Sequence, residues 1–185
     1  MQLPTFAQVI DPVLIRRHDI SGPRYTSYPT ADRFVEAFGE TEFRQWLAKR
    51  NIGGINQPLS LYVHLPFCDT LCYYCACNKV ITRDHSRSAK YINYLERELA
   101  LLGPLLGEDR QLCQMHWGGG TPTFLAREEM ARLVRLIDTH FRRPTDCECS
   151  LEVDPRRVEP GTMEFLGSLG MRAALHKPDA VRDHE

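Results

Sequence analysis

The sequence lacks long apolar runs and any strong excess of charge. No stretch approaches eighteen consecutive apolar residues, so we expect no conventional membrane-spanning helix. Lysine and arginine together number 23 against 24 aspartates and glutamates, which gives no global signal for binding nucleic acid or a membrane surface. The N-terminus lacks a basic segment followed by an apolar core, so we expect no signal peptide and a cytoplasmic location.

Cysteine, by contrast, is abundant, with seven in 185 residues. Four of them, Cys68, Cys72, Cys75 and Cys77, fall within ten residues, which is too close for a typical disulfide framework. In a chain without an export signal, such crowding indicates metal or redox chemistry. The other three are scattered, and we expect Cys113, which lies in an apolar run, to be a small buried thiol.

Apolar periodicity predicts a repeated order of strand, loop and helix after residue 58. The expected strands cover 59–65, 112–117 and 149–153, and the expected helices cover 88–102, a stripe from Met130 to Phe141, and 161–169. Repeats of this kind form parallel βαβ units, in which the loops after the strands carry the site.

The predicted units divide the chain into three parts. Residues 1–58 form an extension with one short helix that starts at Thr41 as N-cap, residues 59–171 form a core of three βα units, and residues 172–185 form a divergent polar tail. Two alanines and a leucine before Pro178 make a poor strand, so we expect no fourth strand. Three parallel strands leave an open edge. We therefore expect a truncated chain, from a frameshift, an early stop or a partial gene, that is inactive alone.

The cysteine loop allows two kinds of metal site. Cys68, Cys72 and Cys75 are separated by three and then two residues, which lets one short loop wrap three corners of a four-iron cube and leave one iron open. A structural zinc site would use Cys77 as a fourth thiolate. Only one residue separates Cys75 from Cys77, which makes joint tetrahedral ligation awkward, so the spacing favours the iron–sulfur cluster.

Two further features follow the second and third predicted strands. Gly118-Gly119-Gly120 lets the backbone approach a ligand, although a tight turn is the better explanation of three glycines taken alone. Glu152 alternates with Leu151 and Val153, so it is expected to point into the barrel when these two face the helices.

The cysteine spacing directly after a strand, with Tyr74 just before the third cysteine, resembles the signature of the radical S-adenosylmethionine (SAM) superfamily. That resemblance implies an α/β fold, the N-terminal part of a parallel, TIM-like partial barrel. It also implies a 4Fe-4S cluster held by the three cysteines, whose open iron chelates SAM and whose electron cleaves SAM to a 5′-deoxyadenosyl radical. In this superfamily a glycine-rich segment after the second strand binds the methionine amino group of SAM.

Longer strings resemble oxygen-independent coproporphyrinogen III oxidases: SGPRYTSYPTADRF, SLYVHLPFC, LCYYCACNK, HWGGGTPTFL and SLEVDPR. The resemblance implies oxidative decarboxylation of two propionates of coproporphyrinogen III to the vinyls of protoporphyrinogen IX. It implies Cys77 as an extra, non-ligating catalytic cysteine and Arg24 as a partner of a propionate. The implied SAM contacts are Tyr62, Tyr74, Gly119, Gly120, Thr121 and Glu152. The electron donor and acceptor stay unidentified, and we expect a monomer.

A related group of haem-carrying proteins is the main rival by resemblance. That group lacks the cysteine at the place of Cys77 and the GPRYTSYPT string, both of which this chain has. The resemblance therefore favours the oxidase. It ends near residue 171, where the oxidases continue into further strands.

Overall fold

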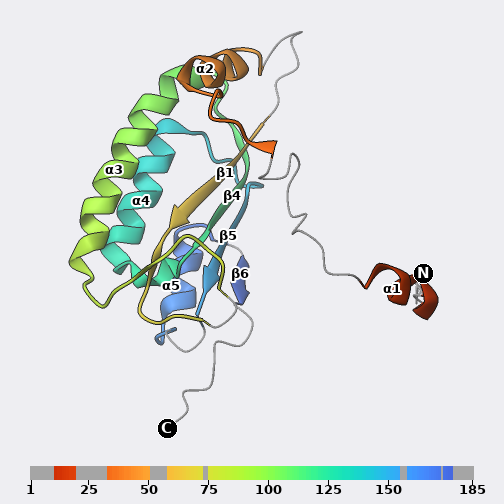
Figure 1. Ribbon diagram of the computed structural model, residues 1–185. Helices are drawn as coiled ribbons and strands as arrows, with labels where there is room; N and C mark the ends of the chain where they lie inside the picture. Colours follow the sequence, from red (N-terminus) through yellow and green to blue (C-terminus); the bar gives the residue numbers. More distant parts are fainter. Residues whose placement is uncertain are drawn as a thin grey trace, which may run out of the picture. The chain divides into compact units, whose positions relative to one another are not determined.

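The computed structural model describes residues 11–19, 33–50, 58–72, 75–154, 158–171 and 173–176 (Figure 1). The chain divides into a small unit, Met1–Glu42, and a large unit, Phe43–Glu185. In the small unit, helix α1 (Pro12–His18) is capped by Asp11, whose side chain accepts a hydrogen bond from the Val13 amide at 2.8 Å.

Helix α2 (Glu40–Ala48) begins one residue before the predicted N-cap. Thr41 therefore lies inside the helix, and its assignment as the capping residue was wrong. The carboxylate of Glu42 instead accepts a hydrogen bond from the Gly39 amide at 2.9 Å. A residue within the first turn thus binds back to an amide that would otherwise lack a partner.

The large unit is built on one parallel sheet of four strands in the order β1 (Leu59–Leu65), β4 (Leu112–Gly119), β5 (Glu148–Val153) and β6 (Ala173–His176). The first three strands match the predicted ones, and the α/β class with parallel strands is confirmed. A second, two-stranded parallel sheet pairs β2 (Phe67–Cys68) with β3 (Val80–Ile81). The two short strands of this sheet flank the cysteine loop.

Strand β6 corrects the expectation that no fourth strand would form. It pairs with β5 in parallel register, with Ser150 opposite Ala173 and Val153 opposite His176. Pairing with an existing strand supplies backbone hydrogen bonds that do not depend on side-chain propensity. The segment of Ala173 to His176 is therefore a strand although its composition is poor for one.

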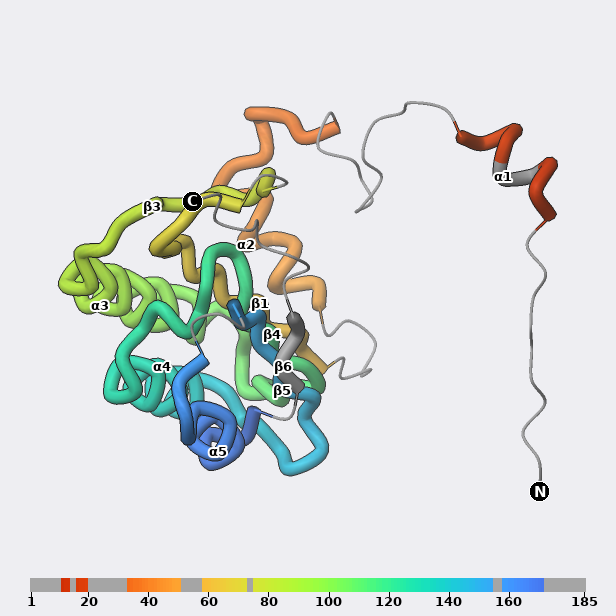
Figure 2. Tube along the Cα trace, turned by 90° about the horizontal axis from the view of Figure 1, so that it is seen from below, coloured from red at the N-terminus to blue at the C-terminus, as the bar shows by residue number. Residues whose placement is uncertain are grey.

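Helices α3 (Ser86–Leu102), α4 (Arg127–His140) and α5 (Thr162–Ser168) lie on one side of the four-stranded sheet (Figures 1 and 2). Two 3₁₀ helices, η2 (Gly103–Leu106) and η3 (Pro122–Phe124), complete the connections. Helix α3 starts two residues earlier than predicted, and α4 starts at Arg127 because the Glu129 carboxylate accepts a hydrogen bond from the Ala126 amide at 3.0 Å. None of the helices in the described ranges is long and apolar enough to cross a membrane.

The core fills the space between the sheet and these helices. Its largest fully buried side chains include Trp117, Met115, Leu151, Ile92, Leu133 and Ile137. In the strands, every second residue faces this core and the residues between face away from the helices. The sheet therefore presents a separate, polar face on which the candidate site lies.

Cys113 is exposed, which contradicts the predicted buried thiol. It falls at the irregularity in the pairing of β1 with β4, where Leu59 pairs with Leu112 and Ser60 pairs with Gln114. A bulge of this kind adds one residue to a strand and shifts the alternation of its side chains. The Cys113 thiol lies 3.8 Å from the Ser60 hydroxyl, at the border of the sheet.

Candidate active site at the carboxyl ends of the strands

Cys68 anchors the start of the cysteine loop. It lies in β2, is buried, and its sulfur lies 3.7 Å from the Thr121 hydroxyl, which donates a hydrogen bond to it. The backbone is fixed on both sides, since the Val80 amide donates to the Pro66 carbonyl at 2.8 Å and the Thr82 amide donates to the Cys68 carbonyl at 2.9 Å. The first cysteine is thus held by the small sheet and by the loop that follows β4.

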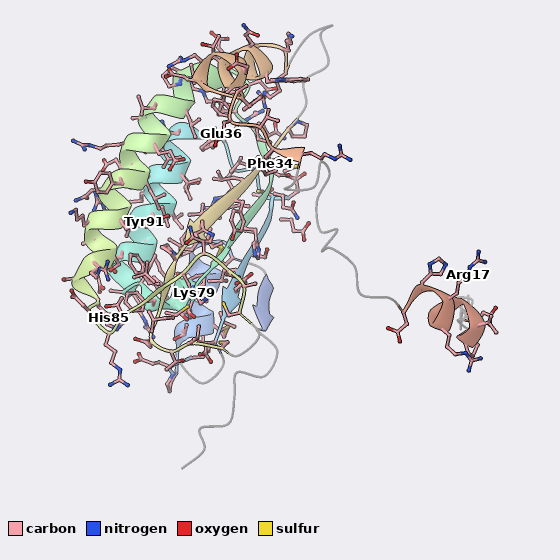
Figure 3. The ribbon with its side chains drawn as sticks, in the orientation of Figure 1. Arg17, Phe34, Glu36, Lys79, His85 and Tyr91 are labelled. Atoms are coloured by element: carbon pink, nitrogen blue, oxygen red, sulfur yellow. The ribbon has the colours of Figure 1, made fainter. Side chains whose placement is uncertain are left out.

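The other loop cysteines are more accessible. Cys72 and Cys75 are half-buried, and the Cys75 amide donates to the Cys72 carbonyl at 3.0 Å. Cys77 is exposed. The ammonium of Lys79 donates to the carbonyls of Cys75 and Cys77 at 3.2 and 3.3 Å and so holds the second half of the loop (Figure 3).

His64 connects this loop to strand β1. Its Nε2 lies 2.8 Å from the Asn78 carbonyl, and its Nδ1 lies 3.1 Å from the Tyr62 hydroxyl. A carbonyl only accepts, so Nε2 donates, and in the neutral ring Nδ1 accepts from Tyr62. The Tyr91 hydroxyl of α3 donates to the His64 carbonyl at 2.8 Å (Figure 3). His64 therefore fixes the exit of the loop against the sheet.

The three loop thiols are donors of the kind that an iron–sulfur cluster takes. Among the residues that the structure describes, no three His, Cys, Asp or Glu side chains converge to hold one metal ion. The choice of a cluster over zinc stays a prediction.

The glycine segment has mainly an internal role. A Cβ on Gly120 would lie 2.4 Å from the Phe67 carbonyl oxygen, and the Gly120 amide donates to the Leu65 carbonyl at 2.7 Å. Gly119 has φ +104°, a conformation that side chains disfavour. The segment therefore packs directly against the backbone that leads into Cys68, as the tight-turn explanation expects. A contact of the segment with a ligand stays a prediction.

The polar face of the sheet brings together side chains from three strands. Tyr62 of β1, His116 of β4 and Glu152 of β5 all lie there, and the Tyr62 and His116 rings stack with centroids 5.9 Å apart. Leu151 and Val153 are buried in the core, which confirms the predicted orientation of Glu152. Burial raises the pKa of Tyr62, and the nearby negative groups of Glu152 and Cys77 raise it further. Tyr62 thus lies between the sheet face and the cysteine loop.

Two predicted site residues, Arg24 and Tyr74, lie outside the described residues. The described ones gather at the carboxyl ends of β1, β4 and β5. His64 and His116 were not predicted, and Gly118 was predicted only as part of the glycine segment, although a signal for all three exists. Each occupies a polar or small position in the period-two alternation of its strand, as Tyr62 and Glu152 do.

The family model described as the radical SAM superfamily matches residues 62–184, and the chain belongs to that superfamily. Relatives with known names indicate which family of this superfamily the chain belongs to. The chain is 46% identical over 145 residues to the oxygen-independent coproporphyrinogen III oxidase of Mannheimia haemolytica, a match that covers 78% of this chain and 96% of the relative. It belongs to this oxidase family.

Longer relatives and a solved structure agree with this membership. The enzymes of that name from Escherichia coli K12 and Pseudomonas aeruginosa are 46% and 48% identical over 160 and 162 residues, which cover 86% of this chain but 34% and 35% of theirs. The solved structure of the E. coli coproporphyrinogen III oxidase, a radical SAM enzyme, superposes with a TM-score of 0.78 and 42% identity over 90% of this chain and 36% of that one. The chain spans about a third of the length of these relatives. Membership of the superfamily implies SAM and an iron–sulfur cluster.

Proposed function

We propose that this chain carries the cluster- and SAM-binding part of an oxygen-independent coproporphyrinogen III oxidase, which converts coproporphyrinogen III to protoporphyrinogen IX by oxidative decarboxylation. One observation supports this most strongly. The anchored cysteine loop lies at the carboxyl end of β1, beside the polar face that carries Tyr62 and Glu152. The shared name of the relatives supports the choice of substrate.

Cys68, Cys72 and Cys75 would hold a 4Fe-4S cluster and leave one iron open. When bound, the cluster supplies the electron that cleaves SAM to a deoxyadenosyl radical. The chain positions the ligands for it: Thr121 donates to the Cys68 sulfur, and Lys79 fixes the backbone beyond Cys75. Hydrogen bonds to sulfur help to set the reduction potential of a cluster, so Thr121 has a role in the proposal besides contact with SAM.

The polar face would hold SAM beside this loop. A carboxylate such as Glu152 accepts hydrogen bonds from ribose hydroxyls or from an amine, and the face of the Tyr62 ring would attract a cation such as the sulfonium. Cys77 is exposed, and it stays our proposed catalytic residue. Arg24 as partner of a propionate, an unidentified electron donor and acceptor, a monomer and a cytoplasmic location also stay predictions.

The first experiment uses the chain itself. We expect anaerobic reconstitution with iron and sulfide to give a brown protein whose absorption changes when SAM is added. The variants C68A, C72A and C75A should lose the cluster, whereas C113A, which changes an exposed cysteine outside the loop, should keep it. A colourless, zinc-loaded product would contradict the proposal. So would tight haem binding without a cluster, which would favour the haem-carrying alternative.

The second experiment tests the substrate. The 160 residues that align with the E. coli oxidase are placed in that enzyme instead of its own segment. The chimera should form deoxyadenosine and convert coproporphyrinogen III to protoporphyrinogen IX, and C75A in the same chimera should do neither. A chimera that takes up the cluster and cleaves SAM but leaves coproporphyrinogen III unchanged would refute the proposed substrate.

A further inference from the structure

His116 lies at the centre of the polar face, between residues of both neighbouring strands. In the sheet register it stands opposite Tyr62 on β1 and opposite Ser150 on β5. Its Nδ1 lies 2.8 Å from the Ser150 hydroxyl, and its Nε2 lies 3.8 Å from a carboxylate oxygen of Glu152. Its ring also stacks on that of Tyr62, with 18° between the planes. One imidazole of β4 thus contacts both neighbouring strands, β1 and β5.

The two ring nitrogens have different neighbours, which defines one arrangement of protons. A carboxylate only accepts, which favours the tautomer with the Nε2–H edge toward Glu152; in that tautomer Nδ1 accepts from the Ser150 hydroxyl. Ser150 is buried and fixes the ring through the shorter contact. The distance of 3.8 Å is longer than a hydrogen bond, so the ring meets Glu152 through contact and electrostatic attraction.

Gly118 makes room for this arrangement. An added Cβ at Gly118 would lie 3.1 Å from three side-chain atoms at once: Oε1 of Glu152, Nε2 of His116 and Cε2 of Tyr62. The three side chains therefore meet above one glycine of β4. Because no side chain rises from that glycine, Glu152 can extend from β5 toward β1, where Tyr62 and the cysteine loop lie.

We propose that His116 is a positioning residue that holds the Glu152 carboxylate, above Gly118, in the orientation in which it receives SAM. This inference rests on the proposed use of the polar face for SAM. A carboxylate held by a fixed neighbouring ring loses less rotational freedom when the ligand binds, so the binding of the ligand is stronger. His116 itself need not touch the ligand.

Two substitutions separate this role from simple packing. In H116N the amide reaches the position of Nδ1 and can bond to Ser150, but it does not reach Glu152. In H116Q the longer amide reaches the position of Nε2. We expect H116N to weaken SAM binding about tenfold, because the attraction between His116 and Glu152 is lost, and H116Q to weaken it about threefold, because part of that attraction is kept. The exposed His18→Asn serves as control and should bind SAM as the wild type does.

The measurement is the Kd for SAM of the reconstituted chain, with iron content as a check that the cluster is intact. Because His116 acts through Glu152, H116N should add no loss to that of E152A in the double variant. Wild-type affinity in H116N, equal losses in H116N and H116Q, or additive losses in the double variant would each overturn the inference. A wild-type chain that takes up its cluster but binds no SAM would overturn the proposed function first.

A spectroscopic measurement on the wild-type chain tests the inference even if the His116 variants do not fold. In the metal-free wild-type chain, the ¹⁵N shifts of the His116 ring should be those of the Nε2–H tautomer, and S150A should change them while it leaves the ring in place. S150A should also weaken SAM binding about threefold, since the ring loses its anchor. An Nδ1–H tautomer, or S150A with wild-type shifts and affinity, would refute the role.

Discussion

The contact of Gly120 with the backbone before Cys68 gives a sharp prediction. In Gly120→Ala, the new Cβ would lie 2.4, 2.6 and 2.7 Å from Phe67 O, Pro66 C and Leu65 O. All three are backbone atoms, which cannot rotate away as a side chain does. The backbone must therefore separate, and the hydrogen bonds from the Gly120 and Thr121 amides, both 2.7 Å long, are lost or stretched.

The magnitude follows from these two effects. Overpacking of a tight contact costs about 1–3 kcal/mol, and a lost hydrogen bond costs about 1 kcal/mol. We expect Gly120→Ala to lower the free energy of unfolding by about 3 kcal/mol. With a urea dependence of about 2 kcal/mol per molar, the midpoint should fall by about 1.5 M. Cluster uptake should fall as well, because the displaced segment leads directly into Cys68.

Gly167→Ala is the matched control. Gly167 lies in α5, and an added Cβ would meet no atom within 4 Å. Replacing glycine by alanine in a helix should raise stability by up to about 1 kcal/mol. Urea unfolding followed by circular dichroism measures both variants. If Gly120→Ala unfolds at the wild-type midpoint and takes up a full cluster, the reasoning about this contact is refuted.

Three other predictions concern the framework of the site. Arg143 bonds Asp138 at 2.9 Å and the Leu169 carbonyl at 2.8 Å, so R143M should lower the free energy of unfolding by about 2 kcal/mol. Arg132 forms an exposed ion pair with Glu96, so R132M should lower it by less than about 1 kcal/mol. Equal losses in the two variants would contradict this. Burial raises the pKa of the Cys147 thiol to about 12. The stability that the protonated thiol contributes is therefore complete below the pKa of the unfolded chain, near 8.5, and is lost as pH rises toward 12. Between pH 7 and 9.5 the wild type should lose about 1 kcal/mol more stability than C147A, and parallel pH curves would refute this. T121V removes the hydrogen bond to the loop sulfur, so the cluster should have a more negative reduction potential in redox titrations; an unchanged potential would count against that contact.

Much of the fold follows from the period of the apolar residues. Strand β1 begins and ends where alternation and Pro66 predict, because both its burial and its end are local properties. Strand β6 could not be predicted in this way, since it forms by pairing with β5 and not through its own composition. The exposed Cys113 was missed because a bulge changes the alternation, and bulges leave no reliable mark in a single sequence.

The site residues likewise divide into those that local spacing predicts and those that only the sheet register brings together. The cysteine loop is visible in the sequence because its spacing is itself the signal. His116 and Gly118 become meaningful only through the register that sets β4 between β1 and β5. A single histidine in a strand carries no spacing pattern, so its neighbours across the sheet had to be seen.

The central claim is that three loop cysteines hold a cluster with one iron open to SAM. Mössbauer spectroscopy of the chain reconstituted with ⁵⁷Fe tests it most directly, with and without SAM. The account predicts the spectrum of a four-iron cluster in which SAM changes the signal of one iron, and the loss of this spectrum in C72A but not in C77A. A four-iron spectrum that SAM leaves unchanged, or a cluster that persists in C72A, would contradict it.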